Sequence, residues 1–146
     1  MIFIYKILYR LHLLYCFVRR PKVYGAYCII RRDDKILLIK NSYKDYWTIP
    51  CGMANKNESF LLAAMRETQE EVGINLEPEN VFFKRLILST IEYKFDHIYI
   101  YESSVDSSTN PTIDQKEVID SMWVSKNELN QYDVFSPIKP YLFLEE

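Results

Sequence analysis

The segment from Gly52 to Ile74, GMANKNESFLLAAMRETQEEVGI, constrains this chain most, because it specifies a short helix together with an unusual charge pattern. Ser59 is a suitable N-cap, and Gly73 stands where a left-handed residue commonly ends a helix. Between them, residues suited to burial recur at helical spacing: Leu61, Met65, Thr68 and Val72. The pattern predicts a helix over residues 59–72 with one buried stripe.

Three glutamates of this helix, Glu67, Glu70 and Glu71, share one face away from the buried stripe. With about 100° per residue, Glu70 and Glu71 lie within about 60° of Glu67, on either side of it. Like charges at this spacing cost about 0.2–0.5 kcal/mol per pair. Either the face is simply solvated, or a cation compensates it. Mg²⁺ and Mn²⁺ prefer oxygen ligands and often bind through carboxylates together with substrate phosphates.

The rest of the chain predicts a mixed α+β domain. Its 146 residues are 49% hydrophobic and 26% charged, as expected for one globular domain. A hairpin is predicted over residues 23–41, further strands over 46–50, 81–93, 97–105 and 121–125, a loop over 107–117, and short helical pieces over 126–132 and 136–146. The net charge of −2 argues against binding to double-stranded nucleic acid. Three cysteines without metal-type spacing fit reduced thiols, so we expect a cytoplasmic location.

Residues 1–20 are predicted to form an apolar helix that carries basic residues and is ended by Pro21. Arg10 argues against a span of the membrane, since a charge near its centre costs about 2.5–3.5 kcal/mol. The apolar surface must still be covered by the chain's own domain, a second copy or lipid. From the sequence we favour a homodimer, and an anionic membrane surface facing Lys6, Arg10, Arg19 and Arg20 is the alternative.

The spacing within residues 52–74 resembles the signature of the Nudix (MutT-like) hydrolases, GX5EX7REUXEEXGU, where U is a bulky apolar residue. All seven fixed letters match, Ile74 fits the final U, and Thr68 takes the place of the first U. The resemblance implies a Nudix fold over residues 21–146, a mixed sheet sandwiched by helices, with the N-terminal helix added to it. It also implies Mg²⁺- or Mn²⁺-dependent hydrolysis of the pyrophosphate bond in a nucleoside diphosphate linked to another moiety.

The resemblance assigns catalytic and metal-binding roles within the helix. Glu70 and Glu71 match the principal metal ligands, and Glu67 matches a glutamate that binds metal or acts as the base. Arg66 matches an arginine that orients a glutamate by paired hydrogen bonds, a task that suits its planar guanidinium.

Other positions of the signature match structural residues. Glu58 lies near the helix start, Gly52 allows the tight loop before it, and Gly73 lets the chain leave it. One departure is Cys51, which stands where many family members have a glycine whose backbone carbonyl can contact metal. Any residue offers a carbonyl, so Cys51 stays a candidate ligand through its backbone, although a positive φ there would strain it.

A carboxylate outside the helix is also expected, because Nudix enzymes often recruit one from a later loop. Glu117 lies six residues before Trp123 and is our candidate for the additional metal ligand or base, while Asp120 lies three before it. The alternative is that Glu117 is an ordinary loop carboxylate.

The substrate is not specified beyond a small nucleotide derivative, since the subfamily patterns that we sought downstream of residue 74 do not match. Nucleoside triphosphates and nucleotide sugars are our first expectation, and capped RNA ends stay open. There are two alternatives to this function. The chain could be a regulatory domain that binds a nucleotide with weak or no catalysis, or a Nudix protein at the membrane periphery.

Overall fold

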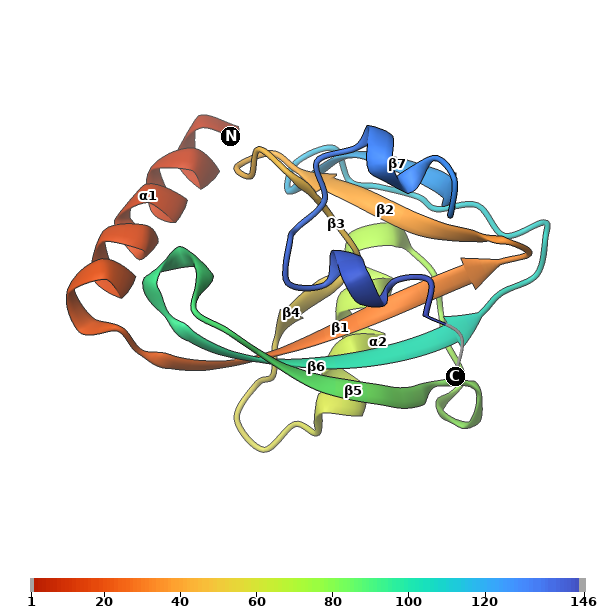
Figure 1. The fold of residues 1–146 in the computed structure, drawn as a ribbon, viewed down its shortest axis with the longest axis horizontal. Coiled ribbons are helices and arrows are strands. Elements are labelled where there is room, and N and C mark those ends of the chain that lie inside the picture. The colour runs from red at the N-terminus through yellow and green to blue at the C-terminus, as the bar shows by residue number, and fades with distance from the viewer. Residues whose placement is uncertain (1, 145–146) are drawn as a thin grey trace.

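The computed structural model describes residues 2–144, which form two helices, seven strands and four short 3₁₀ turns (Figure 1). The helices are α1 (Ile2–Arg19) and α2 (Phe60–Val72). The strands are β1 (Lys22–Arg32), β2 (Lys35–Asn41), β3 (Trp47–Thr48), β4 (Cys51–Met53), β5 (Phe82–Ser89), β6 (Phe95–Ser104) and β7 (Val118–Ser125). The 3₁₀ turns are η1 (Pro78–Asn80), η2 (Ile91–Tyr93), η3 (Leu129–Gln131) and η4 (Lys139–Tyr141).

All seven strands belong to one mixed sheet with the order β3-β2-β1-β6-β5. Only β1 and β6 pair in parallel, and the other pairs are antiparallel. In addition, β7 pairs with β2 and β4 pairs with β1. The mixed α+β class and the mixed sheet predicted from the sequence are confirmed.

The sheet is covered on both faces, and each face has its own hydrophobic cluster. Helix α2 packs Ala63, Ala64 and Val72 against one set of strand residues. The other cluster includes Leu129 of η3 and the side chains of Phe135, Ile138 and Leu142 around η4. Because β1 is buried on both sides, its central residues are apolar without alternation.

The functional helix begins and ends as predicted. Ser59 accepts a hydrogen bond from the Leu62 N–H at 3.2 Å and caps α2. Gly73 has φ +68°, and its N–H donates to the carbonyl of Gln69. A Cβ atom there would lie 3.3 Å from the carbonyl oxygen of Thr112, so glycine also lets the loop after β6 pass close to the end of α2.

One local prediction was wrong, and one short strand was missed. The strand predicted over residues 81–93 ends at Ser89, because Glu92 and Tyr93 both adopt φ +61° and form the turn η2. Left-handed backbone at two consecutive residues without glycine cannot be read from periodicity. The short strand β4 was not predicted, because its three residues include Gly52 and a polar loop follows it.

Helix α1 stands at one end of the molecule, beside the turn that joins β5 to β6 (Figure 1). It ends at Arg19, and Arg20 turns the chain with φ +45° before Pro21. Its stripe of Tyr5, Tyr9, Leu13 and Cys16 is partly or fully buried, and Cys16 is completely buried. The N-terminal helix predicted from the sequence is therefore present, and one narrow side of it rests on the domain.

Candidate active site

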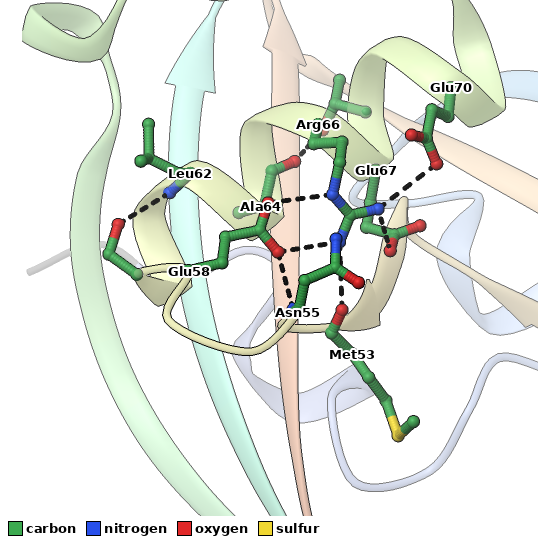
Figure 2. A network of polar contacts seen from close by, with 10 residues as sticks. Met53, Asn55, Glu58, Leu62, Ala64, Arg66, Glu67 and Glu70 are labelled. Atoms are coloured by element: carbon green, nitrogen blue, oxygen red, sulfur yellow. Dashed lines mark hydrogen bonds and ion pairs between the residues drawn. The ribbon is translucent and has the colours of Figure 1, made fainter.

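Arg66 connects most of the acidic residues predicted for the site (Figure 2). Its Nε donates to Glu58 at 2.9 Å, its Nη1 donates to Glu67 at 2.6 Å and to Glu70 at 3.2 Å, and its Nη2 donates to the Met53 carbonyl at 3.0 Å. A planar guanidinium can hold several acceptors in fixed directions at once. Arg66 therefore holds Glu58, Glu67 and Glu70 in fixed directions relative to one another.

Glu58 positions Arg66 from the loop before α2. Its Oε1 and Oε2 accept from Arg66 Nε and Nη2 at 2.9 and 3.0 Å, and Oε2 also accepts from the Asn55 N–H at 2.8 Å. The hydrogen bond from Arg66 lowers the pKa of Glu58, and the bond to Glu58 helps to raise the pKa of Arg66. Glu58 is therefore a charged support for the arginine, in keeping with the structural role predicted for it.

Glu67 lies against the backbone of Gly52. A Cβ atom at Gly52 would lie 2.1 Å from Glu67 Oε1 and 2.5 Å from Oε2, so any larger residue would displace the carboxylate. Burial raises the pKa of Glu67, and the hydrogen bond from Arg66 opposes that increase. The arrangement gives Gly52 a specific function, which is to let the β4 backbone pass beneath this glutamate.

Glu71 is the most buried of the three glutamates on α2, with 8% of its surface exposed. Its Oε2 accepts from the Cys51 N–H at 2.9 Å, and its Oε1 lies 3.5 Å from Asn41 Nδ2. Burial raises its pKa to about 8, because little water remains to solvate the charge. The shared helix face predicted for the glutamates thus runs from the interior at Glu71 to an exposed position at Glu70.

Cys51 fits its position without backbone strain, because it is not among the residues with positive φ. Its N–H is bonded to Glu71, and its thiol lies 4.0 Å from Thr48 Oγ1. Burial raises the pKa of the thiol to about 12, which makes it a neutral packing group rather than a reactive thiolate. The strain considered for a cysteine at this position does not arise.

Glu117 comes to the site from the residue before β7. Its Oε1 accepts from the Tyr43 hydroxyl at 2.9 Å, and its carbonyl accepts from the Ser42 N–H at 2.8 Å. Asp120, in contrast, is exposed and accepts a hydrogen bond from the adjacent Ser121 N–H. The structure brings Glu117 to α2 and leaves Asp120 on the surface of the sheet.

A pocket of about 490 Å³ opens beside these carboxylates. Glu67, Glu70 and Glu117 line it, whereas Glu71 lies behind its wall. The remaining wall includes tyrosines, lysines and a second acidic group, among them Tyr27, Tyr43, Lys44, Glu92, Lys94 and Asp96. The volume is in the range of small-molecule sites.

Helix α1 also contributes to this pocket, through Tyr9 and His12. The hydroxyl of Tyr9 donates to Glu92, which also accepts from Tyr46 at 2.6 Å and pairs with Lys94 at 2.9 Å. Tyr9 and Tyr43 are in ring contact, with centroids 5.2 Å apart. The N-terminal helix is thus fixed to the pocket wall by a buried polar cluster.

The oxygen atoms of the site fit a hard divalent cation in their chemistry. Asn41 Oδ1 and Ser42 Oγ are buried and have no hydrogen-bond partner among residues 2–144. Asn41 contacts Glu71 through its Nδ2 atom, and the Ser42 N–H donates to the Glu117 carbonyl. Over the same residues, no three acidic, histidine or cysteine side chains converge on one metal position. The ion pairs with Arg66 engage one oxygen of each carboxylate, Glu67 Oε1 and Glu70 Oε2.

Several pocket residues were missed from the sequence because no signature marks them. Tyr43 and Lys44 belong to the loop between β2 and β3, and Tyr9 and His12 belong to α1. The stripe of Tyr5, Tyr9, Leu13 and Cys16 at helical spacing was the available signal for the side of α1 that faces the domain. Tyr9 of this stripe donates to Glu92, and Glu92 belongs to the turn η2, which periodicity did not predict.

Comparisons with known proteins agree with the fold and the signature. The NUDIX domain family matches residues 21–143. An uncharacterized Nudix hydrolase of Listeria monocytogenes, lmo0368, is 30% identical over 125 residues, which are 82% of this chain and 72% of that protein.

Solved structures show the same fold. A MutT protein from Methanosarcina mazei has a TM-score of 0.72 at 19% identity and covers 85% of this chain and 92% of that one. An Ap4A hydrolase of C. elegans has a TM-score of 0.70 at 20% identity, with 82% and 92% covered. The family match spans most of the chain and includes every element that carries the carboxylates, so this chain belongs to the Nudix family.

Proposed function

We propose that this protein hydrolyses the pyrophosphate bond of a nucleoside diphosphate linked to another moiety, with Mg²⁺ or Mn²⁺ as cofactor. The observation that carries the proposal is the pocket wall formed by Glu67, Glu70 and Glu117 with Glu71 behind it. Among residues 2–144, Arg66 pairs with Glu67 and Glu70, and a divalent cation would supply further positive charge for the carboxylates gathered here. Membership of a hydrolase family agrees with this chemistry.

Glu67, Glu70, Glu71 and Glu117 are the side chains proposed to hold the metal, with the Cys51 carbonyl as a further candidate. A bound divalent cation would offset phosphate charge and acidify an attacking water. Arg66 would keep Glu67 in place through its 2.6 Å hydrogen bond, and Glu58 would keep Arg66 in place. Glu67 and Glu117 are the candidates for the base, because both line the pocket and carry a carboxylate that can accept a proton.

We propose that the nucleotide part of the substrate contacts the remaining lining of the same pocket. Tyr9 and Tyr43 provide aromatic rings there, and Lys44 provides positive charge. Tyrosine rings can stack on a base, and a lysine can pair with phosphate. Nucleoside triphosphates and nucleotide sugars are the substrates that we propose to test first, since one nucleotide suits a pocket of about 490 Å³.

The test is a panel of nucleoside triphosphates, nucleotide sugars, dinucleoside polyphosphates and RNA with a 5′-triphosphate, assayed with Mg²⁺ or Mn²⁺ for nucleotide and phosphate release. Glu70→Gln and Glu71→Gln should each reduce turnover of the best substrate by about 10²–10⁴-fold while the protein stays folded. Glu79→Gln on the exposed turn η1 is the matched control. Full activity in both site variants would overturn the assignment, and tight nucleotide binding without turnover would favour the regulatory alternative.

A further inference from the structure

The outer face of α1 is apolar and has no partner among residues 2–144. The side that faces the domain is the stripe of Tyr5, Tyr9, Leu13 and Cys16, and the element that α1 chiefly contacts is η2. Figure 1 shows that the opposite side of α1 is directed away from the sheet. The protein's own core, one of the three covers considered from the sequence, therefore covers only a narrow part of this helix.

Phe3 and Phe17 are exposed on the side of Lys6 and Arg10. Six further exposed residues, all aliphatic, form one face. At about 100° per residue, they span an arc of about 120°, whose centre is opposite Tyr9 and which also includes Tyr15. Their exposed fractions are between 42% and 69%. The residues of this outer face are Ile4, Ile7, Leu8, Leu11, Leu14 and Val18. Single hydrophobic residues scattered over a surface are ordinary, but a contiguous apolar face of this size marks a surface that another molecule covers.

The charges of α1 lie at the borders of the outer face. On the same helical projection, Lys6 and Arg10 follow one border and Arg19 follows the other. Helix α1 contains no acidic residue, and Arg20 and Lys22 follow it directly. Long basic side chains beside an apolar face can reach upward to phosphate groups while the apolar residues enter the acyl region.

We propose that the outer face of α1 docks on an anionic lipid surface, with the helix lying in the plane of the interface. A second copy is the weaker occupant, because two such helices packed face to face would bring their basic borders together without an acidic partner on either helix. Among residues 2–144, no helix is long and apolar enough to cross a bilayer. This preference replaces the homodimer favoured from the sequence, and the positions of the charges are the reason.

Docking in this orientation would also place the pocket at the membrane side of the molecule. Tyr9 and His12, on or beside the inner stripe of α1, line the pocket, and the Tyr9 hydroxyl is bonded to Glu92. The helix that lies on the lipid is therefore the same helix that forms one wall of the proposed active site.

The test is sedimentation of the full-length protein with vesicles of phosphatidylcholine alone, and with vesicles of equal parts phosphatidylcholine and phosphatidylglycerol. We expect the protein to sediment with the anionic vesicles and to remain in solution with the neutral ones. Lys6→Gln together with Arg10→Gln should weaken binding by about fivefold per charge removed, and added salt should weaken it further.

Leu11→Glu should abolish sedimentation, because it places a charge at the centre of the outer face, where Leu11 is 58% exposed and supports no core packing. Phe82→Glu is the matched control, since Phe82 is 62% exposed at the start of β5, the opposite end of that strand from η2 and α1. Both variants should keep the thermal unfolding midpoint of the parent protein. Two results would overturn the proposal: no sedimentation with anionic vesicles, or a dimer in vesicle-free solution that Leu11→Glu converts to a monomer.

Discussion

Gly52 and Glu67 are placed so closely that the position of the carboxylate depends on the absence of a side chain beneath it. A Cβ atom at Gly52 would overlap the Glu67 carboxylate, 2.1 Å from its carbon and from Oε1. The neighbouring guanidinium of Arg66 fixes the same carboxylate from another side, at 2.6 Å. Two residues of the signature thus define where one glutamate lies, and a perturbation of either should act through Glu67.

Gly52→Ala is expected to reduce kcat by about 10–100-fold, as for loss of an outer-shell support. Alanine is tolerated at the backbone, because φ of Gly52 is not positive, but its methyl group must push the carboxylate aside. Steady-state kinetics on the best substrate of the panel, with a circular-dichroism melt, would test this. Lys56→Ala in the exposed loop between β4 and α2 should leave kcat unchanged. Unchanged kcat in Gly52→Ala would show that the position of Glu67 is not critical.

Arg66→Lys is expected to lower kcat/KM by a similar factor, and Glu58→Gln by less. Lysine keeps the charge but cannot hold Glu58, Glu67 and Glu70 simultaneously with the geometry of a guanidinium. The kinetic titration should include Mg²⁺ concentration, because a displaced carboxylate should raise the amount of metal needed for half-maximal rate. Equal kinetics for Arg66→Lys and the parent protein would mean that only the charge at this position matters.

Much of this network could be predicted from the sequence because its members belong to one helix and the loop before it. Helical periodicity places Glu67, Glu70 and Glu71 on one face, and Ser59 and Gly73 fix the ends of that helix. The different burial of Glu70 and Glu71 could not be predicted, because it depends on β4 and on Asn41 from β2, which approach only in three dimensions. The local sequence pattern predicts the helix and its faces, but which strands pack against each face depends on the topology of the sheet.

The contribution of α1 to the pocket could not be predicted from the sequence, for a related reason. Tyr9 meets Glu92 across 83 positions of sequence, and Glu92 adopts φ +61°, which no propensity favours for glutamate. The sheet class, the hairpin and the short C-terminal helical turns rest on local signals and were confirmed. Long-range polar contacts of this kind carry no periodic signal.

Glu117→Gln should lower kcat more than it raises KM, because its proposed contribution is made in the transition state. Tyr43→Phe should give a smaller decrease, since it removes only the 2.9 Å hydrogen bond that orients Glu117. Asp120→Asn is the matched control on the exposed side of β7 and should behave like the parent protein. A larger effect of Asp120→Asn than of Glu117→Gln would show that Glu117 is an ordinary loop carboxylate.

The buried cluster beneath α1 should make stability depend on pH through Glu92. Burial alone would raise the pKa of this carboxyl, but Lys94, Lys44 and the hydroxyls of Tyr46 and Tyr9 together lower it from 4.5 to about 2. Because the pKa of Glu92 is lower in the folded state, its ionisation stabilises the protein at pH values above the unfolded-state pKa of 4.5. This stabilisation disappears as the pH falls from 4.5 to about 2. The size of this effect is about 3 kcal/mol at neutral pH.

Glu92→Gln should therefore reduce the free energy of unfolding at pH 7, and the difference from the parent protein should shrink steadily between pH 4.5 and pH 2. Urea unfolding at a series of pH values measures both quantities. Tyr9→Phe, which keeps the ring contact with Tyr43 and removes only the hydroxyl, should produce a smaller loss in the same direction. Glu79→Gln on the exposed turn η1 controls for the loss of one negative charge. A difference between Glu92→Gln and the parent protein that stays constant down to pH 2 would show that Glu92 keeps its unfolded pKa, and that the cluster does not bind α1 to the domain by charge.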